Sequence, residues 1–355
     1  MGKIEKEMVK GSQEMKERKS SSEVFITGIR PTGEDLHVGN YLGAVRDLVE
    51  LQRGDRPLLV FVADLHAMTT HEPKEVYENT QNVLINYLAA GVDPELCHFY
   101  IQSSFRDQIL ELEMQLSRFF SVAEAMRVPT LKDKVDDPQK ASLFLLRYPT
   151  LMAADILGMR AGKVPVGEDQ VAHVEVSRLL ARRFNKKYGN VFPLPEVFTT
   201  EPLRLPSLDG RGKMSKSNPK GAVSLNDSEA DVRKKIKRAI TEVLEEKPEQ
   251  INPQVAGLFT MGRELRPNSE EMEALLQMED SYWQGHLQFS QLKTIVAEIT
   301  ARFVGEFQLE KRRWEEKPEL VEKILEKGTE MAKQRISETI ELVHEAIGTS
   351  LRLSS

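Results

Sequence analysis

"VFITGIRPTGEDLHVGNYLGAVRDLVELQ", residues 24–52, places a short apolar run, a glycine-containing polar turn and a helical pattern in direct succession. The run 24–29 has the length and composition of a buried strand. After the turn, apolar residues recur at helical spacing on one face: Tyr41, Leu42, Val45, Leu48, Val49 and Leu51. This stretch therefore predicts a strand that passes through a tight turn into a helix.

The same alternation continues along the next part of the chain. Apolar runs of strand length occupy 58–64, 98–104 and 163–167, and helical patterns fill about 74–90, 107–127 and 140–160. Such alternation predicts an α/β fold, a Rossmann-like doubly wound parallel sheet with helices on both faces. Ligands bind such sheets at the carboxyl ends of the strands, so we expect the site in the loops after residues 29, 64, 103 and 167.

Beyond about residue 226 the pattern is helical only. Segments 227–246, 268–279, 286–315 and 317–347 have helical spacing, and Pro248, Pro253 and Pro267 mark breaks between them. We therefore expect a charged extension over 1–22, a Rossmann-like catalytic domain over 23–225 and an all-helical domain over 226–355.

Composition excludes several classes of protein. The chain has 355 residues, a net charge of −6, 40% hydrophobic and 29% charged residues, which is ordinary for a globular cytosolic protein. No run reaches the roughly 18 apolar residues of a membrane span, and the first residues have no apolar core of a secretory signal. We therefore expect a cytoplasmic protein. The single cysteine, Cys97, excludes an internal disulfide and any multi-cysteine zinc or iron–sulfur site, and its apolar surroundings predict core packing.

Basic residues cluster at 181–187, 232–238 and 310–314, although the chain as a whole is acidic. Each cluster is more typical of a solvated helix face than of a binding surface. Local patches of this kind can nevertheless bind a polyanion. They do not decide the function.

Two short motifs carry the chemistry. "HVGN" (37–40) lies where the first helix is expected to begin, and a helix N-terminus favours anions. Alone it is as typical of a structural histidine as of a site. About 175 residues later, "GRGKMSKSNP" (210–219) holds Lys213 and Lys216 in a predicted loop between a glycine and a proline. Paired with this second motif, "HVGN" becomes a strong signal.

These motifs carry a family resemblance. "HVGN" resembles the HIGH signature of class I aminoacyl-tRNA synthetases, and "KMSKS" matches their second signature. Five segments stand in the order and spacing of bacterial-type tryptophanyl-tRNA synthetases: "GIRPTGEDLHVGNYLGA", "ADLHAMT", "YPTLMAADIL", "VPVGEDQ" and "GKMSKS". The resemblance covers nearly the whole chain after the extension. It implies ATP with Mg²⁺, L-tryptophan and tRNA(Trp) as reactants, a helical domain that meets the anticodon, and a homodimer.

The resemblance also implies roles for individual residues. Catalytic roles fall to His37, Asn40, Lys134, Lys213 and Lys216. The implied ATP-binding set is Arg30, Thr32, Gly39, Asn40, Gly167, Asp169, Gln170, Lys213, Met214, Ser215 and Lys216. The implied tryptophan-binding set is Gly28, His66, Tyr148, Met152, Asp155, Val164, Val166 and Gln170. No metal ligand from the protein is implied.

The segment "YPTLMAADIL" (148–157) supports an indole pocket by its own spacing. Tyr148, Met152 and Asp155 are separated by four and three residues, so one helix face presents all three. An acid in such an apolar helix is costly to bury without a partner, which favours a functional role over a cap or surface position. By resemblance, Asp155 would accept the indole N–H and Met152 would line the apolar slot. Gln102 and Ser103, at the end of the third strand, lie where ligand contacts are expected.

One position departs from the family pattern, and other functions stay open. Many family members carry Gln where this chain has Arg30, so the ammonium or ATP contacts at that position are unsettled. The tyrosine enzyme shares fold and signatures but usually has Gln in place of Met152. A small-molecule adenylyltransferase, or a catalytically reduced synthetase-like tRNA-binding protein, is the further alternative.

Overall fold

A computed structural model of the chain describes residues 24–31, 36–54, 56–132, 142–167, 170–198, 203–215, 217–241 and 248–349. The predicted extension over 1–22 lies outside these residues. The strands are β1 (Phe25–Ile29), β2 (Leu58–Val62), β3 (Cys97–Ile101), β4 (Lys163–Pro165) and β5 (Glu196–Phe198). The helices of the first half are α2 (Val38–Asn40), α3 (Arg46–Leu51), α4 (Asp64–Ala67), α5 (Pro73–Ala89), α6 (Arg106–Ser117), α7 (Val122–Ala125), α8 (Pro129–Lys132), α9 (Leu143–Leu146), α10 (Tyr148–Gly158) and α11 (Val171–Tyr188).

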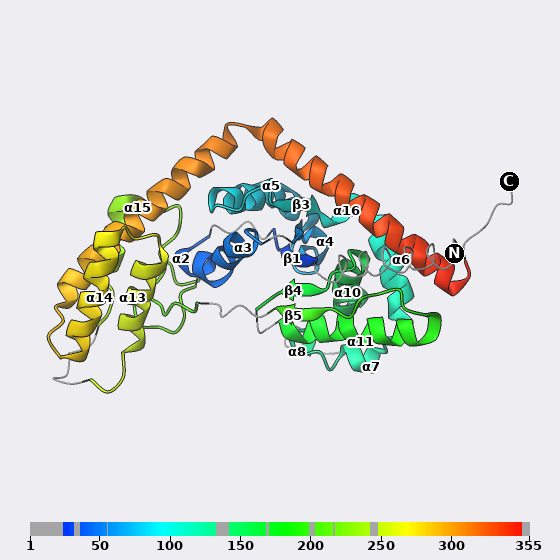
Figure 1. Cartoon of the computed structure of the whole chain (residues 1–355), viewed down its shortest axis with the longest axis horizontal. Coiled ribbons are helices and arrows are strands. Elements are labelled where there is room, and N and C mark those ends of the chain that lie inside the picture. The colour runs from blue at the N-terminus through cyan, green and yellow to red at the C-terminus, as the bar shows by residue number, and fades with distance from the viewer. Residues whose placement is uncertain are drawn as a thin grey trace, which may run out of the picture.

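The strands form one parallel sheet in the order β3-β2-β1-β4-β5. The chain runs outward from β1 through β2 to β3, then crosses back to β4 on the other side of β1 (Figure 1). The order therefore reverses between β1 and β4, which is the place where open α/β sheets bind their ligands. All four predicted strands are present. The short edge strand β5 was not predicted, because its three residues give too little pattern to detect.

Two hydrophobic cores lie on opposite faces of the sheet, because successive strand residues point to opposite sides. Leu58 and Val60 of β2 belong to the core that also contains Leu84 and Leu88 of α5. The alternate residues Leu59 and Phe61 belong to the other core, together with residues of α6, α10, α11 and α16. The nearly continuous apolar runs of the strands follow from burial on both faces. Cys97 is buried in the first core, as predicted, and burial raises the pKa of its thiol to about 12.

The second half of the chain is helical, as predicted. Its helices are α12 (Glu229–Lys237), α13 (Pro253–Glu264), α14 (Ser269–Trp283), α15 (Phe289–Glu315) and α16 (Pro318–Ile347). Two expectations for this half were wrong: α12 ends at Lys237 rather than continuing through 241, and α13 occupies a segment that was read as a break. In the first half, the helix expected over about 107–127 ends at Ser117, and a separate short helix, α7, follows it. Pro253 starts α13 rather than ending a helix, since proline is well suited to the first turn.

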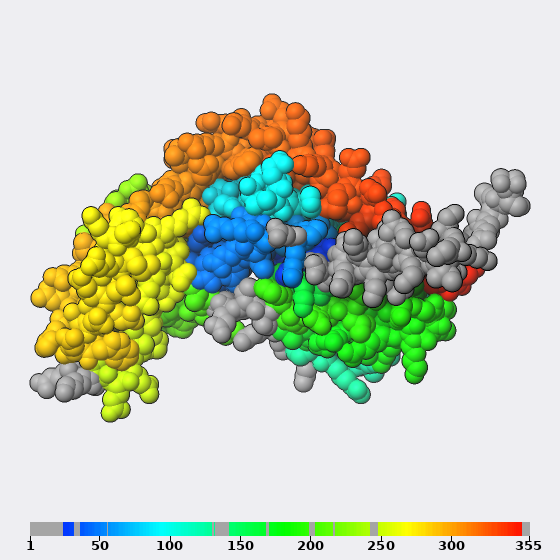
Figure 2. Space-filling model, in the orientation of Figure 1, coloured from blue at the N-terminus to red at the C-terminus, as the bar shows by residue number. Residues whose placement is uncertain are grey.

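The long helices α15 and α16 meet near Lys317 and form an arch over the molecule (Figure 1). In the space-filling view this arch makes a continuous orange-to-red border above α5 (Figure 2). The helix α15 packs on α12, α13 and α5, whereas α16 packs on β3, α6 and α10. The predicted boundary near residue 225 stays a prediction, and α16 lies against the sheet half of the chain.

The helix α16 approaches the edge strand β3 backbone to backbone. A Cβ atom at Gly328 would lie 1.9 Å from the carbonyl oxygen of Phe99, so only glycine allows this approach. Farther along α16, Thr339 Oγ1 donates to Gly158 O at 2.8 Å and Arg335 Nε donates to Met159 O at 2.6 Å. These bonds satisfy carbonyls at the end of α10 that have no partner within that helix. None of the described helices is both long enough and apolar enough to cross a membrane.

Candidate active site

The helix α10 brings three predicted residues to one place. It begins at Tyr148, with Pro149 in its first turn. Tyr148, Met152 and Asp155 follow one face toward the sheet, and Asp155 is 1% exposed. The Tyr148 ring packs edge-on against the ring of His66, with centroids 4.5 Å apart. The three residues therefore share one face of the helix, as their spacing in the sequence predicts.

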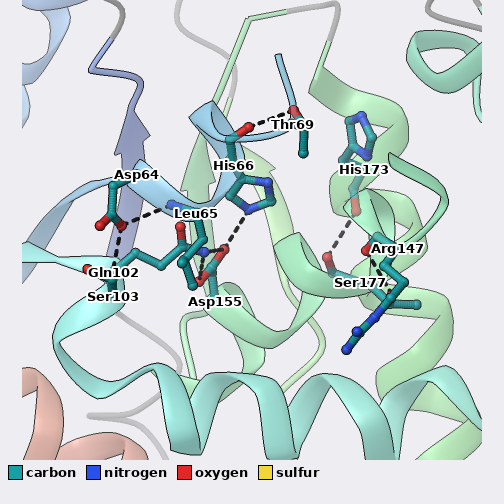
Figure 3. A network of polar contacts seen from close by, with 11 residues as sticks. Asp64, Leu65, His66, Thr69, Gln102, Ser103, Arg147, Asp155, His173 and Ser177 are labelled. Atoms are coloured by element: carbon teal, nitrogen blue, oxygen red, sulfur yellow. Dashed lines mark hydrogen bonds and ion pairs between the residues drawn. The ribbon is translucent and has the colours of Figure 1, made fainter. Parts of the chain in front are cut away.

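Asp155 is bound by side chains from two other strand ends (Figure 3). Gln102 Nε2, just after β3, donates to Asp155 Oδ1 at 2.8 Å and to Oδ2 at 2.9 Å. His66 Nε2, in the helix after β2, lies 2.8 Å from Asp155 Oδ2. Because the facing atom is a carboxylate oxygen, we assign the proton of the imidazole to Nε2. Burial raises the pKa of Asp155, and the hydrogen bond from His66 opposes that rise.

A second buried acid holds the same turn in place. Asp64 Oδ1 accepts from Ser103 N and from Leu65 N, each at 3.0 Å. Burial raises the pKa of Asp64, whereas its hydrogen bonds with Ser103 lower it. Asp64 thus ties the end of β2 to the end of β3 and sets where Gln102 points. Its role was not predicted from the sequence.

The network leaves two buried atoms without a partner among the described residues. These are His66 Nδ1 and Gln102 Oε1. Buried polar atoms in native proteins are nearly always hydrogen-bonded, so an exception points to a functional role. His66 is also a wall residue of a cavity of about 320 Å³.

That cavity opens where β1 and β4 separate. Among the described residues, the two strands share one register pair, Phe25 with Lys163. Beyond it, the contact continues through Thr27 Oγ1, which donates to Pro165 O at 3.2 Å. The space between the diverging strand ends is the crevice expected at a reversal of strand order.

Seven of the eight residues predicted to bind tryptophan line this cavity: Gly28, His66, Tyr148, Met152, Val164, Val166 and Gln170. Asp155 does not line it and lies behind the wall, one hydrogen bond beyond His66. A carboxylate has about four lone-pair sites, so Asp155 retains acceptor capacity beyond its present bonds. Position 28 favours glycine because a Cβ atom there would lie only 2.7 Å from Phe61 Cζ.

The motif "HVGN" forms a helix start, as predicted. His37 caps α2: Asn40 N donates to His37 Nδ1 at 3.1 Å, and His37 N donates to Asn40 Oδ1 at 3.1 Å. The helix continues through a π-helical turn at Tyr41–Val45 into α3. A π-helical turn within a helix is rare and is often found at functional sites.

The structure brings the two signature motifs together. A Cβ at Gly39 would meet the His37 ring at 2.9 Å and Met214 Cβ at 3.4 Å. The chain after the second motif pairs with the first: Val38 N donates to Val223 O at 2.9 Å, and Leu225 N donates to Leu36 O at 2.8 Å. Lys213 is exposed at the side of this contact. None of these five predicted residues lines the cavity between β1 and β4: His37, Gly39, Asn40, Lys213 and Met214.

The ATP-binding set is thus divided between two places. Arg30, Gly167 and Gln170 line the cavity with the tryptophan set, and Ser215 follows Met214 in the signature loop. Thr32, Lys134, Asp169 and Lys216 lie outside the described residues. Within the described part of the chain, no group of three or more His, Cys, Asp or Glu side chains is placed to hold a metal ion.

Sequence reasoning missed a polar clamp at the base of the signature loop. Asn218 Nδ2 donates to both carboxylate oxygens of Asp209 at 3.0 Å, and Ser207 Oγ donates to Oδ1 at 2.6 Å. These hydrogen bonds lower the pKa of Asp209. Gly221 packs so closely that a Cβ would lie 1.9 Å from Ser207 Oγ. Asp209 and Asn218 flank the motif in the sequence, and that flanking position was the available signal.

A second missed group anchors the start of α10. Glu113 of α6 is 1% exposed and accepts from Thr150 Oγ1 at 2.6 Å. Arg147 Nε donates to both oxygens of the same carboxylate at 3.2 and 3.1 Å. Glu113 therefore fixes the residues on both sides of Tyr148. No local pattern marks this contact, because its partners are more than thirty residues apart.

Comparison with known proteins assigns the chain to a group. Residues 18–305 match the family model described as tRNA synthetases class I (W and Y). The tryptophan–tRNA ligase of Porphyromonas gingivalis is 36% identical over 332 residues, covering 92% of this chain and 99% of the relative. That of Chlamydia caviae is 35% identical, covering 93% and 97%.

Solved structures agree with the sequence comparison. Tryptophanyl-tRNA synthetase from Campylobacter jejuni, complexed with ADP and tryptophan, superposes with a TM-score of 0.75 at 30% identity and covers 92% of this chain and 99% of that one. The enzyme from Mycoplasma pneumoniae gives a TM-score of 0.77 at 29% identity, covering 92% and 97%. A tyrosyl-tRNA synthetase from Aeropyrum pernix, at 22% identity and a TM-score of 0.63, shares the fold.

Proposed function

Because the chain belongs to the class I tRNA synthetases of the tryptophan and tyrosine group, we propose that it is a tryptophan–tRNA ligase. It activates L-tryptophan with ATP and transfers the tryptophanyl group to the 3′ end of tRNA(Trp). The observation that carries this assignment is the α10 face, which supplies Tyr148 and Met152 to a cavity and buries Asp155 behind it.

The amino-acid pocket suits an indole better than a phenol. The apolar residues Ile156, Val164 and Val166 line the same cavity as Met152. A flat bicyclic ring fits such a slot, and its single N–H needs one acceptor. We assign that acceptor to Asp155, which lies one hydrogen bond behind His66, so the indole N–H has to pass His66 to reach it. A site built around a buried hydrogen bond rejects analogues that cannot make it by about 10⁴–10⁵.

In the first reaction, a carboxylate oxygen of tryptophan attacks the α-phosphorus of ATP, and the bond to the β-phosphate breaks to release pyrophosphate. The protein contributes mainly positioning and stabilisation of charge on the phosphates. We assign these contacts to His37 and Asn40 at the start of α2 and to Lys213 and Lys216 of the signature loop. The contact between Gly39 and Met214 supports the assignment, because it holds the two motifs against each other.

Four further roles are proposed for ATP and tryptophan. Gly39 leaves room for the adenine ring, and Gly167 allows close backbone approach by the nucleotide. Asp169 would bind the ribose hydroxyls, and Gln170 the substrate ammonium. We propose that Mg²⁺ accompanies ATP on its phosphates.

In the second reaction, a hydroxyl of the terminal adenosine of tRNA displaces AMP from the adenylate. We propose that the helical domain meets the anticodon, and that the enzyme works as a homodimer in the cytoplasm, where tRNA is charged. The exposed apolar side chains on α6, α7 and α9 are candidates for a subunit contact: Met114, Val122, Leu143 and Phe144, which are 56%, 67%, 78% and 41% exposed.

The test is ATP–pyrophosphate exchange by the purified full chain with each of the twenty amino acids. Exchange that depends on tryptophan alone, followed by charging of tRNA(Trp), is the expected result. Exchange with tyrosine would establish the tyrosine ligase instead. Binding of tRNA without exchange would establish the catalytically reduced protein.

A further inference from the structure

Arg30 lies in the wall of the cavity between β1 and β4. It follows the last residue of β1, and its Nη2 donates to Thr70 Oγ1 at 2.9 Å. Its Nε is buried and has no hydrogen-bond partner among the described residues. A guanidinium carries five N–H donors and stays charged at any physiological pH, so this side chain is under-satisfied.

The cavity makes this cation distinctive. Among the described residues that line it, Arg30 is the only lysine or arginine, and the one acid, Asp47, is paired through Oδ1 with Arg46. Most of the other lining residues are apolar or small. A charge in such surroundings is weakly screened and costs free energy until an anion pairs with it. The wall around Arg30 therefore favours a ligand that brings one negative group into the cavity.

Two anions are available in the proposed reaction: the carboxylate of the amino acid and the phosphates of ATP. The residues assigned to the phosphates, His37, Gly39 and Lys213, do not line this cavity. The residues assigned to tryptophan do line it, and Gly28 and His66 share the wall with Arg30. The placement of Arg30 thus separates it from the phosphate residues with which the sequence had grouped it.

We propose that Arg30 binds the α-carboxylate of the amino-acid substrate. The inference rests on the proposed function and names the residue that selects the carboxylate end of tryptophan. With the indole between Tyr148 and Met152, the polar end of the substrate extends toward the strand ends, where Arg30 and Gln170 lie. A guanidinium binds a carboxylate through two parallel N–H bonds and repels the ammonium, which leaves the ammonium to Gln170.

The chemistry predicts in which kinetic constant Arg30 acts. The carboxylate is an anion in the bound substrate but becomes an uncharged acyl group in the adenylate. Arg30 therefore stabilises bound tryptophan more than later states, so it acts on KM for tryptophan rather than on kcat.

The experiment compares L-tryptophan with tryptamine, which has the same indole and ammonium but no carboxylate. Equilibrium binding of each is measured by calorimetry on the full chain without ATP, for the unmodified protein and for Arg30→Ala and Arg30→Gln. We expect Arg30→Ala to weaken tryptophan binding by about 10- to 100-fold, the size of a lost charge-assisted hydrogen bond. Tryptamine binding should stay within about twofold. Arg53→Ala, an exposed arginine outside the cavity, is the control for removal of one positive charge.

Equal weakening of tryptophan and tryptamine would overturn the assignment, because Arg30 would then only shape the cavity. Unchanged tryptophan binding in Arg30→Ala, together with a raised KM for ATP in ATP–pyrophosphate exchange, would assign Arg30 to the phosphates instead. Should Arg30→Ala not fold, Arg30→Gln serves the same comparison, since it removes the positive charge and keeps a polar side chain at this position. The pair tyrosine and tyramine is run in parallel: a loss confined to the member with a carboxylate supports Arg30 even when the bound amino acid is not tryptophan. Failure of this inference is thereby distinct from failure of the proposed function.

Discussion

Replacing Gly39 with alanine should separate adenylate formation from amino-acid binding. The new Cβ would lie 2.9 Å from Cε1 and Nδ1 of His37, closer than carbon atoms pack. Rotation of the ring would break the hydrogen bond that Nδ1 accepts from Asn40 N, and Met214 Cβ, 3.4 Å from the new Cβ, limits movement of the methyl group. The substitution therefore displaces His37, the residue that we place against the phosphates.

The magnitude follows from two terms. Overpacking by one methyl group costs about 1–3 kcal/mol, and a disturbed helix cap costs about 1 kcal/mol more. When this total of about 2–4 kcal/mol is borne in full by the transition state, it corresponds to about 30- to 700-fold in rate, at about 1.4 kcal/mol for each tenfold. Because none of these atoms lines the cavity between β1 and β4, tryptophan affinity should be unchanged.

The assay measures kcat for tryptophan-dependent ATP–pyrophosphate exchange and, separately, tryptophan binding by calorimetry. Gly54→Ala is the matched control, because its Cβ would make only an ordinary contact at 3.4 Å with Leu51 O. Exchange within about threefold of the unmodified chain would refute the role given to His37. A parallel loss of tryptophan binding would refute the separation of the two sites.

Three further outcomes are expected. Gly28→Ala should raise KM for tryptophan about tenfold and lower the free energy of unfolding in urea by about 1–3 kcal/mol, because the new Cβ would meet the Phe61 ring. An unchanged KM and an unchanged free energy of unfolding would contradict this close packing. Arg147→Ala should lower the free energy of unfolding more than Glu113→Gln does, because it leaves the buried Glu113 carboxylate without its charged partner. The reverse order in urea unfolding would contradict the role given to the Arg147–Glu113 pair. Burial raises the pKa of the Asp155 carboxyl above its usual 3.8, so the folded chain binds the carboxyl proton more tightly than the unfolded chain does. The contribution of Asp155 to the free energy of unfolding therefore falls as pH rises from about 4 toward the raised pKa. Asp155→Asn should lack that fall when urea midpoints are compared across this range, and identical profiles would contradict it.

Much of the fold was predictable because its signals are local. Four strands and the long helices follow from runs and spacings within a few turns of chain. Pro253 was misread, since a proline marks either the end of one helix or the start of the next and only packing decides between them. The edge strand β5 was missed because three residues carry no period.

Most residues predicted to bind tryptophan line the observed cavity, but the division of the predicted ATP set between two places could not be predicted. The sequence motifs grouped Arg30 with the residues expected to bind ATP. In the structure Arg30 lines the cavity between β1 and β4 together with Gly28 and His66. The partners of Asp155 were likewise out of reach, because Gln102 is 53 residues away in the chain. Contacts between residues so far apart in the chain depend on the whole fold, and no local sequence pattern predicts them.

The contact of Gly328 with Phe99 has a consequence for how the protein is made. β3 is an edge strand, and an uncovered edge pairs readily with other chains. Its cover, α16, consists of residues 318–347 and is synthesised after all the strands of the described sheet. While the chain grows on the ribosome, that sheet can assemble before α16 has been made, and the outer edge of β3 is uncovered until then. Nascent and truncated chains that end before residue 318 should therefore be the aggregation-prone forms of this protein.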